Sequence, residues 1–212
     1  MMPAMDEILP SEVLVLGIGN LLWADEGFGI RCVEQLAAEW DVPAGVQVMD
    51  GGTQGLYLLP YVQAARRLIV FDAIDYGLPP GTMKRVEGDE VPRFMGAKKM
   101  SLHQTGFQEV LAAAALTDQL PESLLLIGVQ PEELEDYGGS LRAPVKARLG
   151  EAVGMAVAQL ADWGFAPTRR ASADFAGLND PALTMAAYEA GRPSAEAACR
   201  FGDDRLVGLA GR

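Results

Sequence analysis

The sequence contains a single histidine, His103, so any chemistry that needs an imidazole must use it. Acidic residues follow three short apolar segments: Asp25 and Glu26 follow the first, Asp50 the second and Asp72 the third. One imidazole and two carboxylates form a ligand set that suits a borderline metal ion. Glu26, Asp72 and His103 are therefore candidate metal ligands, provided that the fold brings them together.

Each of these residues also has a purely structural interpretation. Glu26 precedes a predicted helix, where the helix dipole favours an acidic side chain. Asp72 could close the turn after its strand. His103 could be a polar surface residue near a helix start, although histidine is the commonest metal-binding side chain. Taken together the three favour a site, because independent loops supply them.

The scaffold follows from apolar segments that alternate with amphipathic ones. Short apolar runs predict buried strands at 12–17, 46–50, 68–73 and 124–129, and an edge strand at 82–87. Helical spacing predicts helices at 28–40, 56–65, about 105–116, with Ser101 as a possible cap, and 144–163. This order predicts a three-layer α/β domain with a mostly parallel, twisted sheet of about five strands and helices on both faces. Ligands of such sheets collect beyond the carboxyl ends of the strands, which is where the candidate residues lie.

Composition excludes several classes of protein. The chain of 212 residues is 50% hydrophobic, which indicates a folded core. Its 29 acidic and 17 basic residues give a net charge of −12, which disfavours a nucleic-acid partner. Cys32 and Cys199 form no CxxC pair, so neither a disulfide scaffold nor a cysteine zinc site is expected. The longest apolar runs are far shorter than the about 18 residues that span a bilayer. The start of the chain lacks the basic region of a signal peptide, so we expect a cytoplasmic protein.

The chain divides into two parts by composition. Residues 1–163 hold the predicted α/β domain and carry the whole net charge. Residues 164–212 contain six arginines and six acidic residues, with prolines that interrupt any periodicity. We expect this Ala/Arg/Pro-containing extension to be partly helical or flexible, with short helices at 182–190 and 194–201.

Common catalytic motifs are absent. The glycines of 17–19 resemble a dinucleotide fingerprint, but Leu22 occupies its third glycine position. Asp25 and Glu26 would also repel a pyrophosphate at the following helix. The sequence contains no P-loop, HExxH or GxSxG motif.

Five sequence blocks identify a family. They are residues 17–29 (GIGNLLWADEGFG), 50–53 (DGGT), 71–73 with 80–82 (FDA and PGT), 101–107 (SLHQTGF) and 128–131 (GVQP). In this order they resemble the nickel–iron hydrogenase maturation endopeptidases, most closely those that process uptake hydrogenases. The resemblance covers residues 13–163 and marks them as a peptidase domain. The extension after 163 lies outside it.

The resemblance implies an activity and a set of ligands. Members of the family remove a short C-terminal extension from the hydrogenase large-subunit precursor after nickel has been installed. Their nickel ligands fall here on Glu26, Asp72 and His103. Nickel is therefore expected to arrive with the substrate, and the protein is expected to act as a monomer, without nucleic acid or membrane.

Two further carboxylates are candidate catalytic residues. Asp25 and Asp50 are the remaining carboxylates that could act as general base, in an aspartyl-type or metal-dependent reaction. Gly51, Gly52 and Thr53 could offer backbone donors to the extended substrate. Three other interpretations stay open: a nickel carrier or assembly factor that uses the same ligands, a nucleotide-dependent enzyme, and a purely structural domain.

Overall fold

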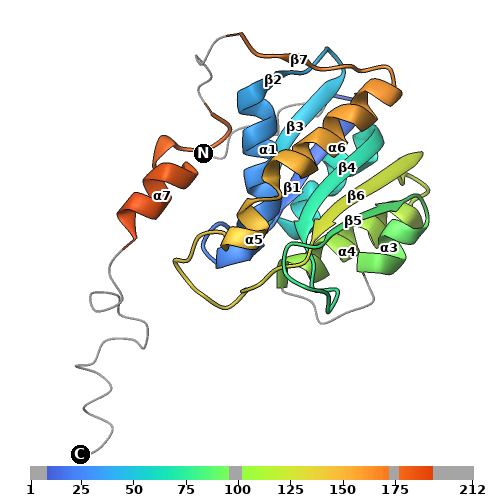
Figure 1. Ribbon diagram of the computed structural model, residues 1–212. Helices are drawn as coiled ribbons and strands as arrows, with labels where there is room; N and C mark the ends of the chain where they lie inside the picture. Colours follow the sequence, from blue (N-terminus) through green and yellow to red (C-terminus); the bar gives the residue numbers. More distant parts are fainter. Residues whose placement is uncertain (1–8, 96–101, 172–176, 193–212) are drawn as a thin grey trace, which may run out of the picture.

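A computed structural model describes residues 9–95, 102–171 and 177–192, with the backbone alone described for 94–95 and 102–105 (Figure 1). Its centre is a five-stranded sheet in the order β3-β1-β4-β6-β5. The first four strands are parallel, and β5 pairs with β6 in the antiparallel direction at one edge. The strands are β1 (Ser11–Ile18), β3 (Val46–Gly52), β4 (Ala65–Ala73), β5 (Met83–Glu87) and β6 (Ser123–Val129).

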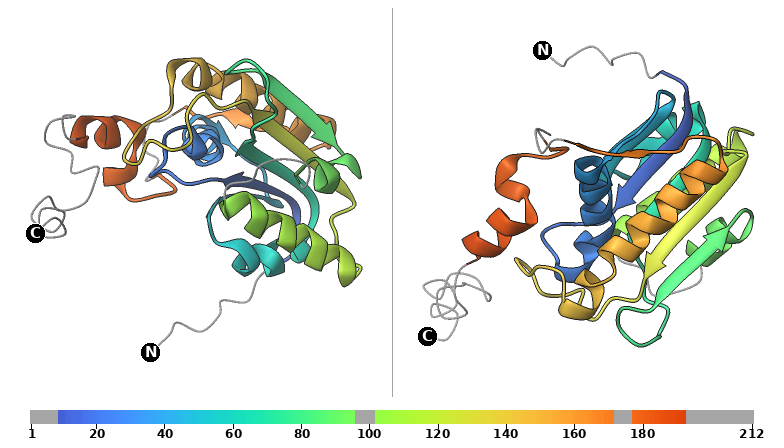
Figure 2. Two further views of the ribbon diagram at one scale, coloured as in Figure 1. Left: turned by 90° about the horizontal axis from the view of Figure 1, so that it is seen from below. Right: turned by 45° about the horizontal axis from the view of Figure 1, so that its top comes forward.

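Helices cover both faces of this sheet (Figure 2). One face packs against helices α1 (Phe28–Glu39), α5 (Ala143–Lys146) and α6 (Leu149–Asp162). The other packs against α2 (Leu59–Ala64), α3 (Glu90–Met95) and α4 (Leu102–Leu116). The predicted three-layer α/β fold with a mostly parallel sheet is therefore confirmed.

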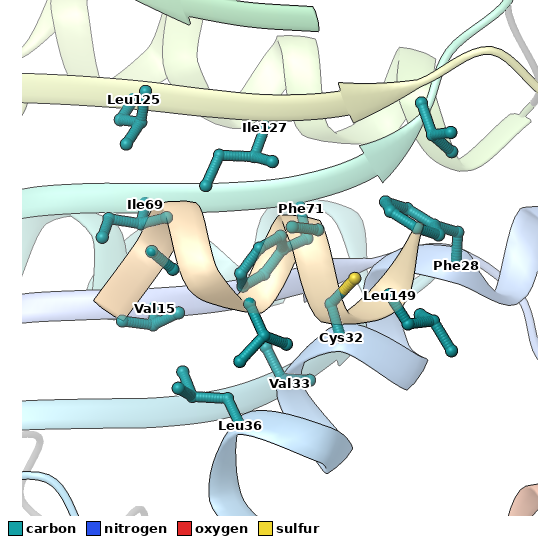
Figure 3. Packing of buried hydrophobic residues seen from close by; sticks show 14 of the residues in the cluster. Val15, Phe28, Cys32, Val33, Leu36, Ile69, Phe71, Leu125, Ile127 and Leu149 are labelled. Atoms are coloured by element: carbon teal, nitrogen blue, oxygen red, sulfur yellow. The ribbon is translucent and has the colours of Figure 1, made fainter. Parts of the chain in front are cut away.

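Strand residues alternate between the two faces because successive side chains of a strand point in opposite directions. Along β4, Ile69 and Phe71 join the cluster under α1 and α6, whereas Leu68 and Val70 join the cluster under α4. Figure 3 shows the first cluster, in which Cys32 packs among aliphatic and aromatic side chains. Fully burying one such large side chain contributes about 1.5–3 kcal/mol.

Three predicted helices of the body differ from those observed. The helix expected at 144–163 is divided into α5 and α6, because a tight turn at Ala147 and Arg148 separates them. In this turn the Arg148 N–H donates to the Val145 carbonyl, three residues back. The helix expected at 56–65 begins as a short 3₁₀ segment, η2 (Gly55–Leu58), before α2, and Pro60 lies in the first turn, where proline is tolerated. The helix α4 begins three residues earlier than expected, and its predicted cap Ser101 lies outside the described residues.

The extension crosses over the body at a small second sheet. The strand β7 (Thr168–Arg169) pairs in the antiparallel direction with β2 (Trp40–Asp41), at the end of α1. The helix expected at 182–190 is observed as η3 (Pro181–Leu183) and α7 (Met185–Gly191), because Thr184 caps α7. The helix expected at 194–201 lies outside the described residues. No helix in the described part of the chain combines the length and apolar character that a bilayer crossing needs.

Candidate functional site

Two close backbone contacts fix the loop that follows β1. The α-carbon of Gly19, at φ +147°, lies so near the Glu26 carbonyl that a Cβ would overlap it. A Cβ on Gly29 would likewise collide with the carbonyls of Ile18 and Phe71. The first turn of α1 therefore lies directly on the ends of β1 and β4. The 3₁₀ turn η1 (Ala24–Gly27), which holds Asp25 and Glu26, is thereby placed at the carboxyl edge of the sheet.

The carboxylate of Asp25 joins η1 to a distant loop. Asp25 is fully buried, and the preceding Ala24 has a left-handed φ of +39°. Its Oδ2 accepts hydrogen bonds from the backbone N–H groups of Glu132 (2.8 Å) and Glu133 (3.0 Å), and its Oδ1 accepts one from Arg142 (2.7 Å). Backbone donors of loop 130–142 thus engage both oxygens of this carboxylate.

Aromatic and backbone contacts reinforce this connection. The rings of Trp23 and Tyr137 meet edge to face, with centroids 5.3 Å apart. The Gly138 N–H donates to the Leu22 carbonyl at 2.7 Å. The loop after β1 and the loop after β6 therefore form one connected rim.

Asp72 lies at the end of the central strand β4 and is fully buried. By strand alternation its side chain lies on the same face as Leu68 and Val70, the face that α4 covers. Its neighbour on β6 is Gly128. A carboxylate buried at a strand end needs compensating partners, so this position is costly for a residue that only closes a turn.

The Tyr76 ring fills the space that Gly128 leaves open, because a Cβ there would meet the Tyr76 hydroxyl at 2.1 Å. Burial raises the pKa of Tyr76 well above its ordinary value, and the nearby charge of Asp72 raises it further. Gln130 fixes this loop: its Oε1 accepts from the N–H groups of Tyr76 (2.7 Å) and Leu78 (3.1 Å). Tyr76 and Gln130 were not among the sequence-predicted site residues.

The backbone of His103 lies in the first turn of α4. This end of α4 meets the segment after β3, where the α-carbons of Gly106 and Gly55 approach each other closely. Because α4 leads into the parallel strand β6, it starts at the carboxyl edge of the sheet. The His103 side chain is outside the described part of the structure.

The three predicted ligands therefore come from elements that meet at one edge. Glu26 is half-buried in η1, which contacts β4, and Asp72 ends β4 on the face where α4 begins. Among the side chains that the structure describes, no group of three His, Cys, Asp or Glu residues is close enough to hold a metal ion. That set excludes His103, so the ligand assignment remains a prediction.

Asp50 lies elsewhere in the site. It pairs with Gly17, whose α-carbon faces α1, so its side chain is on the α1 face of the sheet, opposite Asp72. Its Oδ1 accepts from the Gly52 N–H at 2.8 Å, and its Oδ2 accepts from the Asn179 amide at 2.7 Å. The backbones of β3 and β4 are separated by β1, which places Asp50 and Asp72 about 10 Å apart across two strand spacings.

The environment of Asp50 raises its pKa. Burial is the main cause of the rise. The hydrogen bonds from Asn179 and Gly52 lower the pKa, but they do not cancel the effect of burial. The charge of Glu34 raises the pKa, and that of Arg31 lowers it. Asp50 therefore takes up a proton at a higher pH than an ordinary aspartate.

A groove of about 470 Å³ lies at this edge and is lined by Asp50 together with the loop after β1. Gly52 and Thr53 also line it, as expected for substrate-binding residues, although the Gly52 N–H is already bonded to Asp50. The α-carbon of Gly51 instead packs against the side chains of Leu16 and Ile18. The remaining lining residues include Asn20, Leu21, Leu178 and Asn179.

Asn179 was missed by the sequence analysis because it belongs to the extension, for which no motif was found. Nothing local in the sequence signals its contact with Asp50, since 129 positions separate the two residues.

Comparisons with known proteins agree with this arrangement. A family model described as hydrogenase maturation protease matches residues 30–159. The hydrogenase expression/formation protein HupD of Thiocapsa roseopersicina is 61% identical over 198 residues, which cover 92% of this chain and 90% of that protein. HupM of Azotobacter chroococcum is 60% identical and covers 95% of this chain and 96% of its own.

Shorter relatives match about three quarters of the chain. The hydrogenase 2 maturation protease of Escherichia coli is 40% identical over 154 residues, which are 72% of this chain and 93% of that protein. The solved structure of the hydrogenase maturating endopeptidase HybD from E. coli superposes with a TM-score of 0.71 at 38% identity, and covers 75% of this chain and 98% of that one. The fold, the ordered sequence blocks and these relatives lead to one conclusion: the chain belongs to the hydrogenase maturation protease family.

Proposed function

We propose that this protein removes the C-terminal extension of the large-subunit precursor of a nickel–iron hydrogenase, and that it recognises the nickel already bound in that precursor. The main support is the fully buried Asp72 at the end of the central strand, on the face where α4 begins with the only histidine of the chain. Glu26 adds a second carboxylate from η1, which contacts β4. Membership of the maturation protease family supports the choice of substrate. We further infer that it acts as a monomer in the cytoplasm, in keeping with the buried free thiol of Cys32.

In this proposal Glu26, Asp72 and His103 complete the coordination of the precursor's nickel. Carboxylate oxygens are hard ligands and compete weakly with the thiolates expected in the precursor. Nickel therefore stays with the large subunit when the product leaves. The ion serves as the recognition element that positions the precursor, and Asp50, about 10 Å from Asp72 across two strand spacings, is left to act on the bond that is cut.

We assign proton transfer to Asp50 and a supporting role to Asp25. Asp50 lines the groove, and its raised pKa suits a general base that accepts the proton of the attacking water and returns it to the leaving amine. Asp25 is buried with both oxygens engaged by backbone N–H groups, so we assign it to positioning η1 and Glu26.

The spacing of these groups suggests how the substrate lies. An extended peptide advances about 3.3–3.6 Å per residue, so about three residues span the about 10 Å between the backbones near Asp72 and Asp50. Because the two side chains lie on opposite faces of the sheet, the bond to be cut is expected at least about three residues beyond the residue that holds nickel. Gly52 and Thr53 line the groove beside the extended tail.

The test uses nickel-loaded and nickel-free precursor with the wild-type protein and the variants Asp72→Asn and His103→Ala. Removing a residue that only supports a metal ligand typically lowers metal affinity or activity by about 10–100-fold. Loss of a ligand itself should therefore lower the cleavage rate by at least about a hundredfold. The control Asp89→Asn makes the same chemical change at an exposed position and should cleave at the wild-type rate. Nickel-free precursor should resist cleavage by the wild type.

Two outcomes would contradict the proposal. Normal cleavage of nickel-free precursor would remove the recognition step, and full activity of His103→Ala would remove the ligand assignment. Tight, stoichiometric nickel binding by the protein alone, without cleavage, would instead indicate a nickel carrier.

A further inference from the structure

The extension returns to the groove after it crosses the body. Residues 177–192, called the strap below, lie beside α1 and the loop that follows β6 (Figures 1 and 2). Leu178 and Asn179 at its start line the groove described above. A second cavity, of about 390 Å³, lies between the strap and α1. Leu178 and Met185 pack against the hydrophobic cluster under α1, and polar contacts hold other parts of the strap in place.

The inner anchor of the strap is a buried arginine. Arg31 of α1 is only 4% exposed, and its Nη1 donates to Glu34 (2.7 Å) and to the Leu183 carbonyl of the strap (2.6 Å). Its guanidinium also lies 5.9 Å from the centre of the Tyr188 ring. A buried charge is tolerated only with such partners, and the strap provides two of them.

The outer anchors are ion pairs with the body. Glu189 accepts from Lys146 (2.7 Å) and Ser140 (2.8 Å), and Arg192 pairs with Asp136 at 2.8 Å. Glu189 and Arg192 belong to the end of the strap, whereas Asn179, which contacts Asp50, belongs to its start. Together with the Arg31 anchor, these ion pairs hold the strap so that its first residues lie at the mouth of the groove.

Asn179 is the contact between the strap and the site. Its amide nitrogen donates both to Asp50 (2.7 Å) and to Glu34 (3.0 Å), and so lies between two carboxylates. The pKa of Asp50 is lower with this hydrogen bond than it would be without it. The charged groups that face Asp50 are Glu34 and Arg31, both from α1.

We propose that the strap forms one wall of the substrate groove, and that Asn179 is a positioning residue that holds the Asp50 carboxylate toward an extended polypeptide. The inference rests on the proposed function, because the polypeptide it commits to is the precursor tail at the cleavage site. The match to HupM covers 95% of this chain, whereas the match to the hydrogenase 2 maturation protease covers 72% of it.

The experiment measures kcat/KM against pH for full-length wild type, Asn179→Ala and Asn179→Asp with nickel-loaded precursor. Loss of a hydrogen bond to a charged group should lower kcat/KM of Asn179→Ala by about tenfold. The acid limb of its kcat/KM–pH profile, where activity falls as the pH is lowered, should also move to higher pH, since the pKa of Asp50 rises when the amide is removed. Asn179→Asp adds a negative charge between Asp50 and Glu34, so its acid limb should move further in the same direction.

The control is Gln63→Ala, which removes another side-chain amide, one that donates to Thr117 on the far face of the sheet. It should leave kcat/KM and the acid limb unchanged. Wild-type kinetics for both Asn179 variants would overturn the inference, as would a loss of kcat/KM with an unmoved acid limb and a lowered melting temperature. Failure of the wild type to cleave the precursor would instead overturn the proposed function.

Discussion

Asp25 shows how a carboxylate in this site can have a structural task. Three backbone N–H groups from a loop more than a hundred residues away donate to it, and no water reaches it. A buried acceptor of this kind stabilises both the loop and the turn that holds Glu26. Removing it leaves buried donors without partners.

Asp25→Asn is therefore expected to destabilise the protein by about 1–3 kcal/mol, because the amide turns an NH₂ donor toward backbone donors. Urea unfolding measures this loss. Glu132→Gln, an exposed change in the same loop, should leave the unfolding midpoint unchanged. An Asp25→Asn variant that is fully stable yet inactive would contradict the positioning role and point to proton transfer by Asp25.

Residue types alone predicted that Glu26, Asp50 and Asp72 lie at the carboxyl edge, because polar residues that end buried strands must emerge there. They did not predict the face on which Asp50 lies. Strand alternation puts Asp50 on the same face as Val46 and Val48, but which helices cover that face depends on tertiary packing that the sequence does not display. The donors to Asp25 and the Asn179 donor to Asp50 were missed for a similar reason, since they come from distant segments.

Among the elements, α1 sets the geometry of the site through its first turn. Gly29 lets this turn lie on the carbonyls of Ile18 and Phe71 at distances that no side chain would allow. The position of η1, and of Glu26 within it, depends on that contact. A Cβ on Gly150 or Gly154 of α6, by contrast, would meet no atom within 4 Å.

Gly29→Ala and Gly154→Ala form a matched pair. A methyl group added at Gly29 would lie 2.2 Å from the Ile18 carbonyl oxygen, so α1 must move. We expect this movement to lower the free energy of unfolding by about 1–3 kcal/mol and to reduce cleavage. The Gly154 methyl in α6 meets nothing within 4 Å and should stabilise the protein by about 0.5–1 kcal/mol through helix propensity. Thermal unfolding of both variants distinguishes the effects; equal stabilisation would show that α1 is not seated as described.

The elements of the body were largely predictable because hydrophobic periodicity determines them. The strands at 68–73 and 124–129 appear as β4 and β6, extended by one to three residues. The short strands β2 and β7 and the divided helix α5–α6 were not predicted. Their boundaries depend on tertiary contacts such as the pairing of Trp40 with Arg169.

At the scale of the whole molecule, the strap is held to the body by carboxylates with lowered pKa values. The hydrogen bonds from Lys146 and Ser140 lower the pKa of Glu189. Burial alone would raise the pKa of Asp136, but the hydrogen bonds from Arg142 and Arg192 outweigh it and lower the pKa. Because both pKa values are lower in the docked state, docking is favoured above the ordinary carboxyl pKa of about 4 and weakens as the pH falls through the lowered values.

Glu189→Gln tests this anchor at neutral pH, where acid unfolding of the body does not interfere. Loss of the charge should reduce the hydrogen-exchange protection of α7 amides and leave that of α6 amides unchanged. High salt should have the same effect on the wild type, since ion pairs at exposed positions are screened. Glu122→Gln, which removes an exposed pair with Arg66 on another surface, should leave α7 protection unchanged. Protection of α7 that is insensitive to Glu189→Gln, to salt and to pH would mean that Arg31 and apolar contacts alone hold the strap.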